Sequence, residues 1–290
     1  MRDGTKSVAE ELSDRLQDLT RAERQLADTI RENYPISGLG SITALAENAG
    51  VSTPTVVRMV QKLGFSGYTD FQAELRRELE EKISNPIAKR DKWVESASEK
   101  HILNRFTEAV ISNIEQSLAA VQPETFDEVC RMLSDTDRRV FVVGGRITRT
   151  IADYFFLHLQ VIRRKVIHVQ AISNAWPHYL LDVHRGDVVV IFDVRRYENS
   201  ILRLAEMVRE KGATIVLFTD QWRSPVQKIA DQCFSARISA PSAWDSSVAT
   251  LLLVESLIAA IQEVNWDQTR SRMEDLEMMF DRTRVFRKFT

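Results

Sequence analysis

The chain contains only two cysteines among its 290 residues, Cys130 and Cys233. They lie far apart in the sequence, without the CxxC spacing or the nearby histidines that a zinc site requires. We therefore expect two reduced, buried thiols. We expect no metal and no other cofactor.

Long hydrophobic runs are also lacking. The longest one, ATLLLVESLIAAI, is interrupted by Glu255 and is too short to span a bilayer. The first residues, MRDGTKSVAEELSD, do not contain the apolar core of a signal peptide. These two features predict a cytoplasmic protein with no membrane partner.

Neither sign of charge is in large excess, because the net charge is only -2. The overall composition therefore indicates neither a nucleic-acid partner nor disorder, and any partner has to be found in local sequence. The chain does have 44% hydrophobic residues, which is enough to bury a sizeable core. Its length suggests two domains of about 100 to 200 residues each.

Hydrophobic periodicity divides the chain in two. The periodic segments from residue 16 to about 83 are helical, as in LTRAERQLADTI, where Thr20 and Glu23 form a capping-box pattern. The polar segment SNPIAKRDKWVESASEK is the best linker candidate. Beyond it, short apolar runs alternate with helical stretches, which indicates a parallel sheet with helices on both faces.

The predicted fold class is therefore α + α/β, an all-α domain joined to a doubly wound parallel-sheet domain. Its segments are a helical domain over 1–83, a linker over 84–97, the sheet domain over 98–264 and a helical extension over 265–290. The extension spaces Met273, Leu276 and Phe280 at helical intervals, as expected for a helix that packs on a partner subunit.

Residues 41–65 have the spacing of a helix-turn-helix motif. Ala46 is small where two helices cross, Gly50 follows where a tight turn favours positive φ, and Val56 is an apolar anchor in a second helix. Thr53 is the expected N-cap and Pro54 suits the first helical position. The second helix should therefore run from about residue 54 to residue 62.

This second helix carries polar side chains that could reach phosphates and base edges in a major groove. The candidate DNA contacts, on its expected outer face and at the rim of that face, are Ser52, Thr53, Thr55, Arg58, Gln61 and Lys62. The alternative is a helical hairpin with a solvated polar face. Eleven basic against fourteen acidic residues over 1–85 give a net charge of -3, which weakens the DNA interpretation.

The run GVSTPTVVRMVQKLGFSGYTDFQAELRRELE, residues 50–80, resembles the signature of RpiR/MurR-type bacterial transcription regulators. In that signature a recognition helix is followed by a Leu-Gly-Phe-x-Gly-Tyr/Phe turn and a further helix. In the family this domain is joined to a sugar-isomerase-type (SIS) domain, which residues 100–262 resemble. The resemblance implies operator DNA as a double-stranded partner and a ligand at the carboxyl ends of the strands.

Two loops depart from the SIS pattern. The first usually reads Gly-x-Gly-x-Ser and binds a phosphate through backbone N–H groups and a hydroxyl. Here its candidate residues are Gly144, Gly145, Arg146 and Thr148. The second usually reads Ser-x-Ser-Gly-x-Thr, and its positions follow the buried run VVVIF here. Its candidate residues are Asp193, Arg195, Arg196, Tyr197 and Glu198.

Three interpretations of these charged loops remain open. Arg195 and Arg196, joined by Arg146, could bind an anion such as a small carboxylate or an amino-acid-like metabolite, with Asp193 or Glu198 receiving its amine or hydroxyl. Alternatively, Asp193 and Glu198 neutralise the two arginines, and this ion-pair cluster fills the pocket that binds the ligand in the family. A retained sugar-phosphate site ranks below both.

Two further segments are expected near this crevice. Asp245 lies in the stretch that completes the pocket in the family, so we include it among the effector-binding candidates. Asp220 and Trp222 follow another apolar run and could line the same crevice.

We expect a DNA-binding transcription regulator and not an enzyme. Its SIS-type domain should form a homodimer or homotetramer and sense a small anionic metabolite other than a standard sugar phosphate. The phosphate anchor of an isomerase is altered here, and the five histidines are scattered without a paired carboxylate at motif spacing. The alternatives are a SIS-type sugar-phosphate isomerase or binding protein, and a regulator whose SIS domain only oligomerises.

Overall fold

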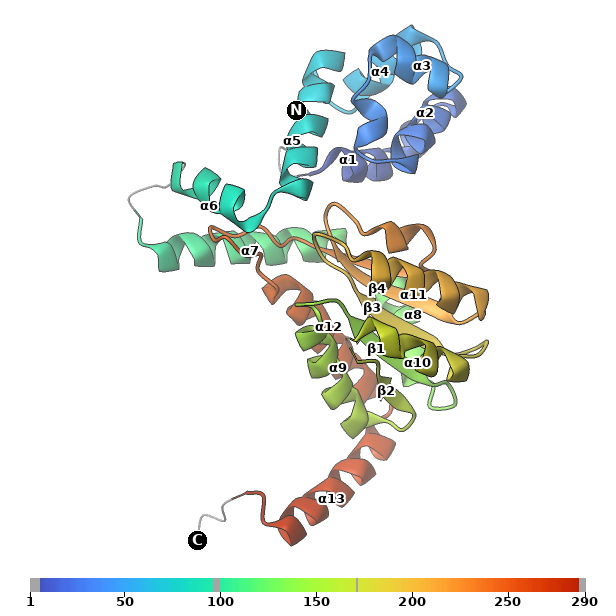
Figure 1. Ribbon diagram of the computed structural model, residues 1–290, viewed down its shortest axis with the longest axis vertical. Coiled ribbons are helices and arrows are strands. Elements are labelled where there is room, and N and C mark those ends of the chain that lie inside the picture. The colour runs from blue at the N-terminus through green and yellow to red at the C-terminus, as the bar shows by residue number, and fades with distance from the viewer. Residues whose placement is uncertain (1–5, 96–99, 171, 287–290) are drawn as a thin grey trace. The chain divides into compact units, whose positions relative to one another are not determined.

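The computed structural model describes residues 6–95, 100–170 and 172–286. The chain forms two compact units, residues 1–92 and 93–290 (Figure 1). The first unit is helical and the second contains a parallel sheet, so the predicted fold class is confirmed.

The first unit begins its helices at polar capping residues. Its helices are α1 (Val8–Asp14), α2 (Arg21–Glu32), α3 (Ile42–Asn48), α4 (Thr53–Lys62) and α5 (Tyr68–Ile83), and α6 (Pro86–Glu95) begins in this unit and ends in the second. The predicted capping box at α2 is confirmed, because the Thr20 side chain and the Glu23 carboxylate each accept a backbone N–H of the other residue. Such reciprocal bonds satisfy donors that the first turn of a helix leaves free.

A small hydrophobic core holds the helices of this unit together. Leu26 and Ile30 of α2, Val56 of α4, and Phe71 and Leu75 of α5 are fully buried in it. Burial of side chains of this size contributes about 1.5 to 3 kcal/mol each. The core therefore fixes α4 relative to α2 and α5.

The segment predicted as a linker contains α6, which the sequence analysis did not predict. The Asn85 Oδ1 atom accepts the N–H groups of Ile87 and Ala88 at 3.0 and 2.9 Å, and Pro86 occupies the first position of the helix. This start signal is a common one. The polar composition of the segment concealed it, and residues 96–97 of the predicted linker lie outside the described residues.

The second unit is built on a five-stranded sheet in which every neighbouring pair is parallel. Its strands are β1 (Val140–Gly144), β2 (Val166–His168), β3 (Val188–Phe192), β4 (Thr214–Asp220) and β5 (Gln232–Ala236). Every residue of β1 and β3 is buried, as the continuous apolar runs of a sheet covered on both faces require.

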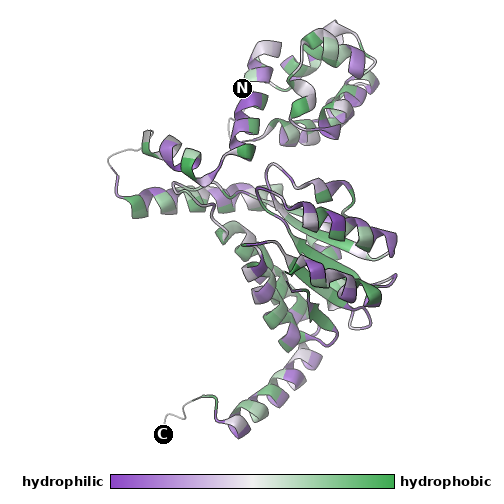
Figure 2. Cartoon of the chain, in the orientation of Figure 1, coloured by the Kyte–Doolittle hydropathy of each residue, from purple (hydrophilic) through white to green (hydrophobic). Residues whose placement is uncertain are grey.

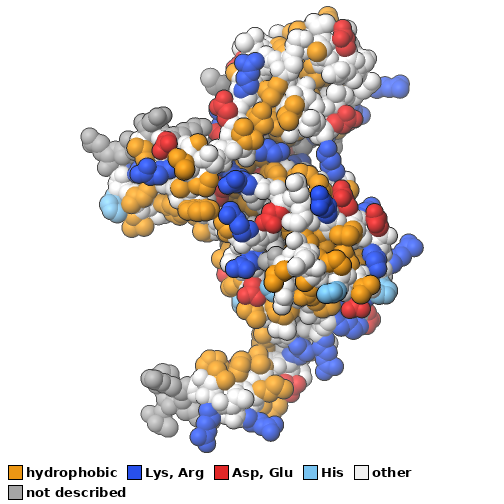
Figure 3. Space-filling view, in the orientation of Figure 1, with side chains coloured by type: hydrophobic (Ala, Val, Ile, Leu, Met, Phe, Trp, Pro, Cys, Tyr) orange, Lys and Arg blue, Asp and Glu red, His pale blue; other side chains and the backbone are white. Residues whose placement is uncertain are grey.

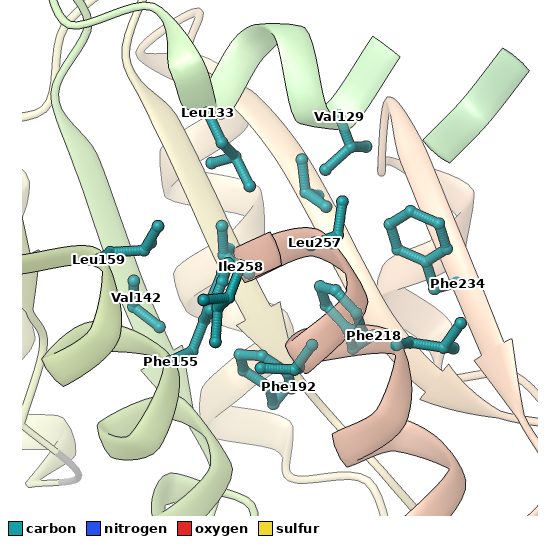
Figure 4. Packing of buried hydrophobic residues seen from close by; sticks show 14 of the residues in the cluster. Val129, Leu133, Val142, Phe155, Leu159, Phe192, Phe218, Phe234, Leu257 and Ile258 are labelled. Atoms are coloured by element: carbon teal, nitrogen blue, oxygen red, sulfur yellow. The ribbon is translucent and has the colours of Figure 1, made fainter. Parts of the chain in front are cut away.

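Helices cover both faces of the sheet. The helices of this unit are α7 (Ile102–Ala120), α8 (Pro123–Ser134), α9 (Arg149–Ile162), α10 (Trp176–Asp182), α11 (Asn199–Glu210), α12 (Val248–Val264) and α13 (Trp266–Thr283). The cluster on one face joins α8, α9 and α12 to strand residues such as Phe192 and Phe218 (Figure 4). The other cluster joins α10 and α11 to the alternate strand residues. Hydrophobic residues accordingly follow the strands and the inner sides of the helices (Figure 2).

The strand order is β2-β1-β3-β4-β5, so the direction of the chain's path across the sheet reverses between β1 and β3. In open parallel sheets, ligands bind beyond the carboxyl ends of the strands at such a reversal. The loops that follow β1 and β3 are the two loops in which the sequence departs from the SIS pattern. The topology therefore brings them to one edge of the sheet.

Helix α13 extends the chain beyond the sheet domain, as the sequence predicts for residues after 264. Its first half packs on α9, where the Arg272 guanidinium donates to the carbonyls of Gln160 and Val161. Met278 and Met279 are about 60% exposed in its second half. Hydrophobic side chains lie on the surface of this helix (Figure 3).

Within the described part of the chain, no single helix is long and apolar enough to cross a membrane. Helices α12 and α13 pass that test only as a pair, by length and composition, and they meet at a bend of 102°. Helix α12 buries seven residues, and Leu253 and Leu257 among them lie in the hydrophobic core of the sheet domain.

A buried carboxylate links three parts of the helical unit. Glu78 of α5 accepts the Val8 N–H at 2.8 Å and the Tyr34 hydroxyl. Burial raises the pKa of Glu78 to about 7, although both hydrogen bonds act to lower it. The protonated carboxyl therefore stabilises the fold at acid pH, and this contribution is lost as the pH rises through 7.

We predict that Glu78→Gln removes this pH dependence. Between about pH 5 and pH 8 the wild-type free energy of unfolding should fall by on the order of 2 kcal/mol more than that of the variant, which keeps only the pH dependence of the other titratable groups. Calorimetric unfolding of the full chain across that range measures both. Glu80→Gln, an exposed carboxylate on the same helix, should behave like the wild type. A Glu78→Gln profile that follows the wild type would contradict the prediction.

Candidate functional site

Helices α3 and α4 form the predicted helix-turn-helix. Gly50 has a φ of 61°, so the predicted positive φ in the turn is confirmed. The Gly50 N–H donates to the carbonyl of Glu47 at 3.0 Å, and the Val51 N–H donates to that of Ala46 at 2.9 Å. The backbone bonds close the end of α3 and set the entry into α4.

Ser52, not Thr53, is the N-cap of α4. Ser52 has extended backbone angles, and its carbonyl accepts the N–H groups of Thr55 at 2.9 Å and Val56 at 3.3 Å. Thr53 is the first helical residue. The prediction of Thr53 as the cap was wrong by one residue, because Ser and Thr have similar capping ability and the spacing alone does not separate them.

Thr55 is only 6% exposed, so the expectation that it lies on the outer face of α4 is wrong. Its hydroxyl lies 2.9 Å from the Ser52 hydroxyl and accepts from the Arg58 guanidinium at 3.3 Å. Arg58 and Gln61 are exposed on the same helix. Thr55 therefore restrains Arg58 and does not itself face solvent.

Lys62, at the end of α4, bridges back to α2. Its ammonium lies 2.7 Å from the Glu23 carboxylate and donates to the Asp18 carbonyl at 3.4 Å. The Lys62 side chain keeps 40% of its surface exposed. The lysine thus ties the recognition helix to the capping box of α2.

The loop between β1 and α9 is held by internal acceptors. The Thr148 Oγ1 atom accepts the Gly145 N–H at 2.8 Å and donates to the Phe192 carbonyl at 2.7 Å. The Arg146 N–H donates to the Glu198 carboxylate at 2.5 Å. A side chain at Gly144 would meet the backbone of Thr148 at 2.6 Å, so this position requires glycine. The Arg146 side chain is exposed.

Asp193 follows β3 and is 3% exposed. It accepts a hydrogen bond from the Ser224 hydroxyl and a long one, 3.4 Å, from the Glu198 N–H. Burial raises the pKa of Asp193 to about 6, and the Ser224 hydrogen bond opposes that rise.

Asp220, the last residue of β4, is fully buried and gathers three donors. Its carboxylate accepts the Arg195 N–H at 2.6 Å, the Trp222 N–H at 2.9 Å and the Tyr197 hydroxyl at 2.7 Å. Burial and the neighbouring Asp220 carboxylate raise the pKa of Tyr197, so its hydroxyl remains a donor. This single carboxylate fixes the path of the loop that follows β3.

The Arg195 guanidinium lies between Asp245 and Trp222. Its Nε atom is 3.3 Å from the Asp245 carboxylate, and its central carbon lies 4.0 Å from the centre of the Trp222 ring. The Arg195 side chain is 8% exposed. The ion pair and the cation–π contact together hold this guanidinium inside the domain.

The two neighbouring arginines therefore have different surroundings. Arg196 is exposed and has a φ of 63°, which turns it away from the path of Arg195. Arg195 forms an ion pair with Asp245, a partner that the ion-pair interpretation did not name. The effector-binding candidates predicted from the sequence thus lie at one edge of the sheet. Among these candidates, Arg146 and Arg196 are the exposed cations.

Three residues outside the predicted effector-binding candidates hold the loops of the site in place. They are Asp220, Trp222 and Ser224. Asp220 and Trp222 entered the sequence analysis only as residues that could line the crevice. The signal that identifies Asp220 is its position, a carboxylate directly after the buried run of a strand that neighbours β3. Across residues 6–95, 100–170 and 172–286, no group of three His, Cys, Asp or Glu side chains could hold a metal ion.

We predict that Arg195→Ala destabilises the sheet domain by about 2 kcal/mol, because it removes a buried ion pair and a stacked guanidinium. Chemical denaturation of the full chain measures the change. Arg196→Ala, which alters the same charge at an exposed neighbour, should change stability by less than about 0.5 kcal/mol. Equal effects of the two substitutions would contradict the environments described above.

Two family models match the chain. The helix-turn-helix domain of the rpiR family matches residues 6–82, and the SIS domain matches residues 132–260. The HTH-type transcriptional regulator HexR of Pseudomonas aeruginosa is 25% identical over 236 residues, covering 79% of this chain and 78% of the relative. An uncharacterised HTH-type transcriptional regulator of Clostridium perfringens, CPE0189, is 24% identical over 221 residues, covering 73% and 75%.

Solved structures share the fold. The sugar isomerase domain of an RpiR transcription factor from Sphaerobacter thermophilus has a TM-score of 0.57 at 21% identity, covering 61% of this chain and 97% of that one. The Vibrio vulnificus NanR protein complexed with ManNAc-6P has a TM-score of 0.54 at 18% identity, covering 94% and 98%. The chain therefore belongs to the RpiR-type transcription regulators, with a helix-turn-helix domain of the rpiR family followed by a SIS domain.

Proposed function

We propose that this regulator binds operator DNA through α4 and that its SIS domain senses a small anionic metabolite other than a standard sugar phosphate. The second part rests on the loop after β1, in which hydrogen-bond donors are bonded to other groups of the same chain. Its Arg146 N–H and its Thr148 hydroxyl are already bound by groups of this chain, whereas the Arg146 and Arg196 side chains remain exposed.

The DNA proposal rests on the outer face of α4. Ser52, Arg58 and Gln61 are exposed there, and Thr53 is partly exposed. Arg58 is restrained by the buried Thr55 hydroxyl, so it loses less conformational entropy when it contacts DNA. Lys62 can reach a phosphate only at the edge of this face, since Glu23 holds its ammonium. We therefore assign Arg58 and Gln61 to direct contacts and Thr55 to positioning.

The effector proposal rests on charge. Two exposed guanidinium groups favour a carboxylate, which arginine binds in bidentate fashion. The Glu198 carboxylate lies at the same edge and could accept an amine or a hydroxyl of the same ligand, whereas Asp193 is too buried to do so. A small carboxylate or an amino-acid-like metabolite combines these groups. The Vibrio vulnificus NanR protein is complexed with ManNAc-6P, so the ligand proposed here differs in class.

A regulator fits this geometry better than an isomerase. An isomerase needs a phosphate anchor together with an acid or base beside the sugar carbonyl. In this chain the donors of the anchor are bound internally, and the Asp193 carboxyl is buried against Ser224. The relative HexR is named a transcriptional regulator, which supports the same conclusion.

We propose a homodimer or homotetramer formed through the SIS domains. A twofold assembly presents paired helix-turn-helix units to half-sites about one helical turn apart, or a multiple of it. An effector that favours one arrangement would shift operator affinity by about 1 to 3 kcal/mol. A regulator whose SIS domain only oligomerises is the second candidate, favoured by the pairing of Arg195 with Asp245.

Arg58→Ala should weaken operator binding at least about tenfold, because it removes a cation from the recognition face. Titration of a labelled operator fragment at fixed salt measures the affinity, and circular dichroism checks the fold. Arg90→Ala removes the same charge from α6, outside the helix-turn-helix, and should bind like the wild type. Unchanged binding by Arg58→Ala would remove Arg58 from the contact set.

A thermal-shift screen of the full chain tests the effector proposal. A small carboxylate or amino-acid-like ligand at 100 times its Kd should stabilise the protein by about 2.7 kcal/mol. The double variant Arg146→Ala/Arg196→Ala should lose the response, and Arg203→Ala, an exposed arginine of α11, should keep it. No response across a broad anion panel from a folded, oligomeric protein would favour the second candidate.

A further inference from the structure

We infer that Glu198 determines ligand specificity at the reversal point of the sheet. Its carboxylate accepts the Arg146 N–H, a backbone donor to which a phosphate would otherwise bind. The native loop therefore rejects phosphate esters. The inference rests on the proposal that this edge of the sheet is the effector site. It goes further by naming the residue that selects the class of ligand.

The position of the Glu198 carboxylate is closely defined. Its Oε1 atom accepts the Arg146 N–H at 2.5 Å. A side-chain carbon built on Gly145 would lie 2.8 Å from the same oxygen and 3.2 Å from the carboxylate carbon. The carboxylate therefore lies directly against the Gly145–Arg146 peptide. Glycine at position 145 is what allows this approach.

Two further donors of the loop, the Gly145 N–H and the Thr148 hydroxyl, are also satisfied from within. Thr148 accepts the Gly145 N–H and gives its own proton to the Phe192 carbonyl. A phosphate that approached the loop would therefore meet a carboxylate in place of free N–H and O–H groups. Two anions in one partly buried position repel each other, since the low local dielectric strengthens their interaction.

Glu198 reaches this position from the N-terminus of α11. It is the N-cap residue of that helix, but its side chain does not cap it. The side chain instead extends to the loop after β1, and the Glu198 N–H points to Asp193 at 3.4 Å. The second oxygen, Oε2, accepts a long hydrogen bond, 3.4 Å, from the Ser200 hydroxyl. An amine or hydroxyl of a ligand could replace that weak contact.

The Glu198 carboxylate therefore distinguishes between two kinds of ligand. A ligand that brings a hydrogen-bond donor to Glu198 gains a charge-assisted bond, whereas a ligand that brings a phosphate must displace the carboxylate from the Arg146 N–H. Serine at position 198 would keep a polar side chain, remove the charge and leave the Arg146 N–H for a phosphate. Arg146 and Arg196 would then lie at the same edge as the bound anion.

Isothermal titration of the full chain with glucose 6-phosphate, and with inorganic phosphate as the minimal probe, tests this inference. Glu198→Ser should bind both at least about tenfold more tightly than the wild type. Glu206→Ser makes the same substitution at an exposed position of α11 and should bind as weakly as the wild type. Glu198→Gln keeps the size of the side chain and removes its charge, so it should fall between the wild type and Glu198→Ser.

Three results would overturn the inference. One is a wild type that binds these probes as tightly as Glu198→Ser, and another is a folded Glu198→Ser that gains no affinity over Glu206→Ser. If Glu198→Ser does not fold, wild-type affinity in Glu198→Gln would overturn it instead. A wild type that still responds to small carboxylates would show that the inference alone has failed, whereas no response of any variant to any anion would end the effector proposal as well.

Discussion

A carboxylate removed from water must find hydrogen-bond donors, and at the end of β4 Asp220 finds three of them. It accepts the N–H groups of Arg195 and Trp222 and the hydroxyl of Tyr197. Removing such a carboxylate would leave all three donors unsatisfied, each at a cost of about 1 to 3 kcal/mol. The loop after β3 follows a path that serves them together, and this path places Arg195 over Trp222 and Glu198 beside the first loop.

The same principle operates twice more along this edge. Asp193 accepts the Ser224 hydroxyl, and Glu198 accepts the Arg146 N–H. In each case a carboxylate of the chain holds donors that lie where a parallel sheet binds its ligands. The acidic side chains that follow the strand VVVIF therefore mostly accept hydrogen bonds from within the chain. What remains for a ligand is a pair of exposed guanidinium groups and one weakly bonded carboxylate oxygen.

The sequence predicted those features that depend on local patterns. The spacing of Ala46, Gly50 and Val56 identified the helix-turn-helix, and alternating apolar runs identified the parallel sheet. Partners in the loops depend on contacts between residues far apart in the chain, and for these the sequence gives no spacing rule. Arg195 pairs with Asp245, fifty positions away, and Glu198 with the backbone of Arg146, fifty-two positions away. A helical wheel likewise placed Thr55 outside, because it cannot show that Ser52 and Arg58 cover its hydroxyl.

Amide hydrogen exchange at Arg146 most directly tests the hydrogen bond between the Arg146 N–H and Glu198, since it reports whether this N–H is bonded without any ligand present. In the full chain at neutral pH, we predict that this amide exchanges much more slowly than its intrinsic rate, and that Glu198→Ser removes the protection while Glu206→Ser preserves it. Exchange of the wild-type amide at the intrinsic rate would show that Glu198 does not hold the loop and would contradict the account.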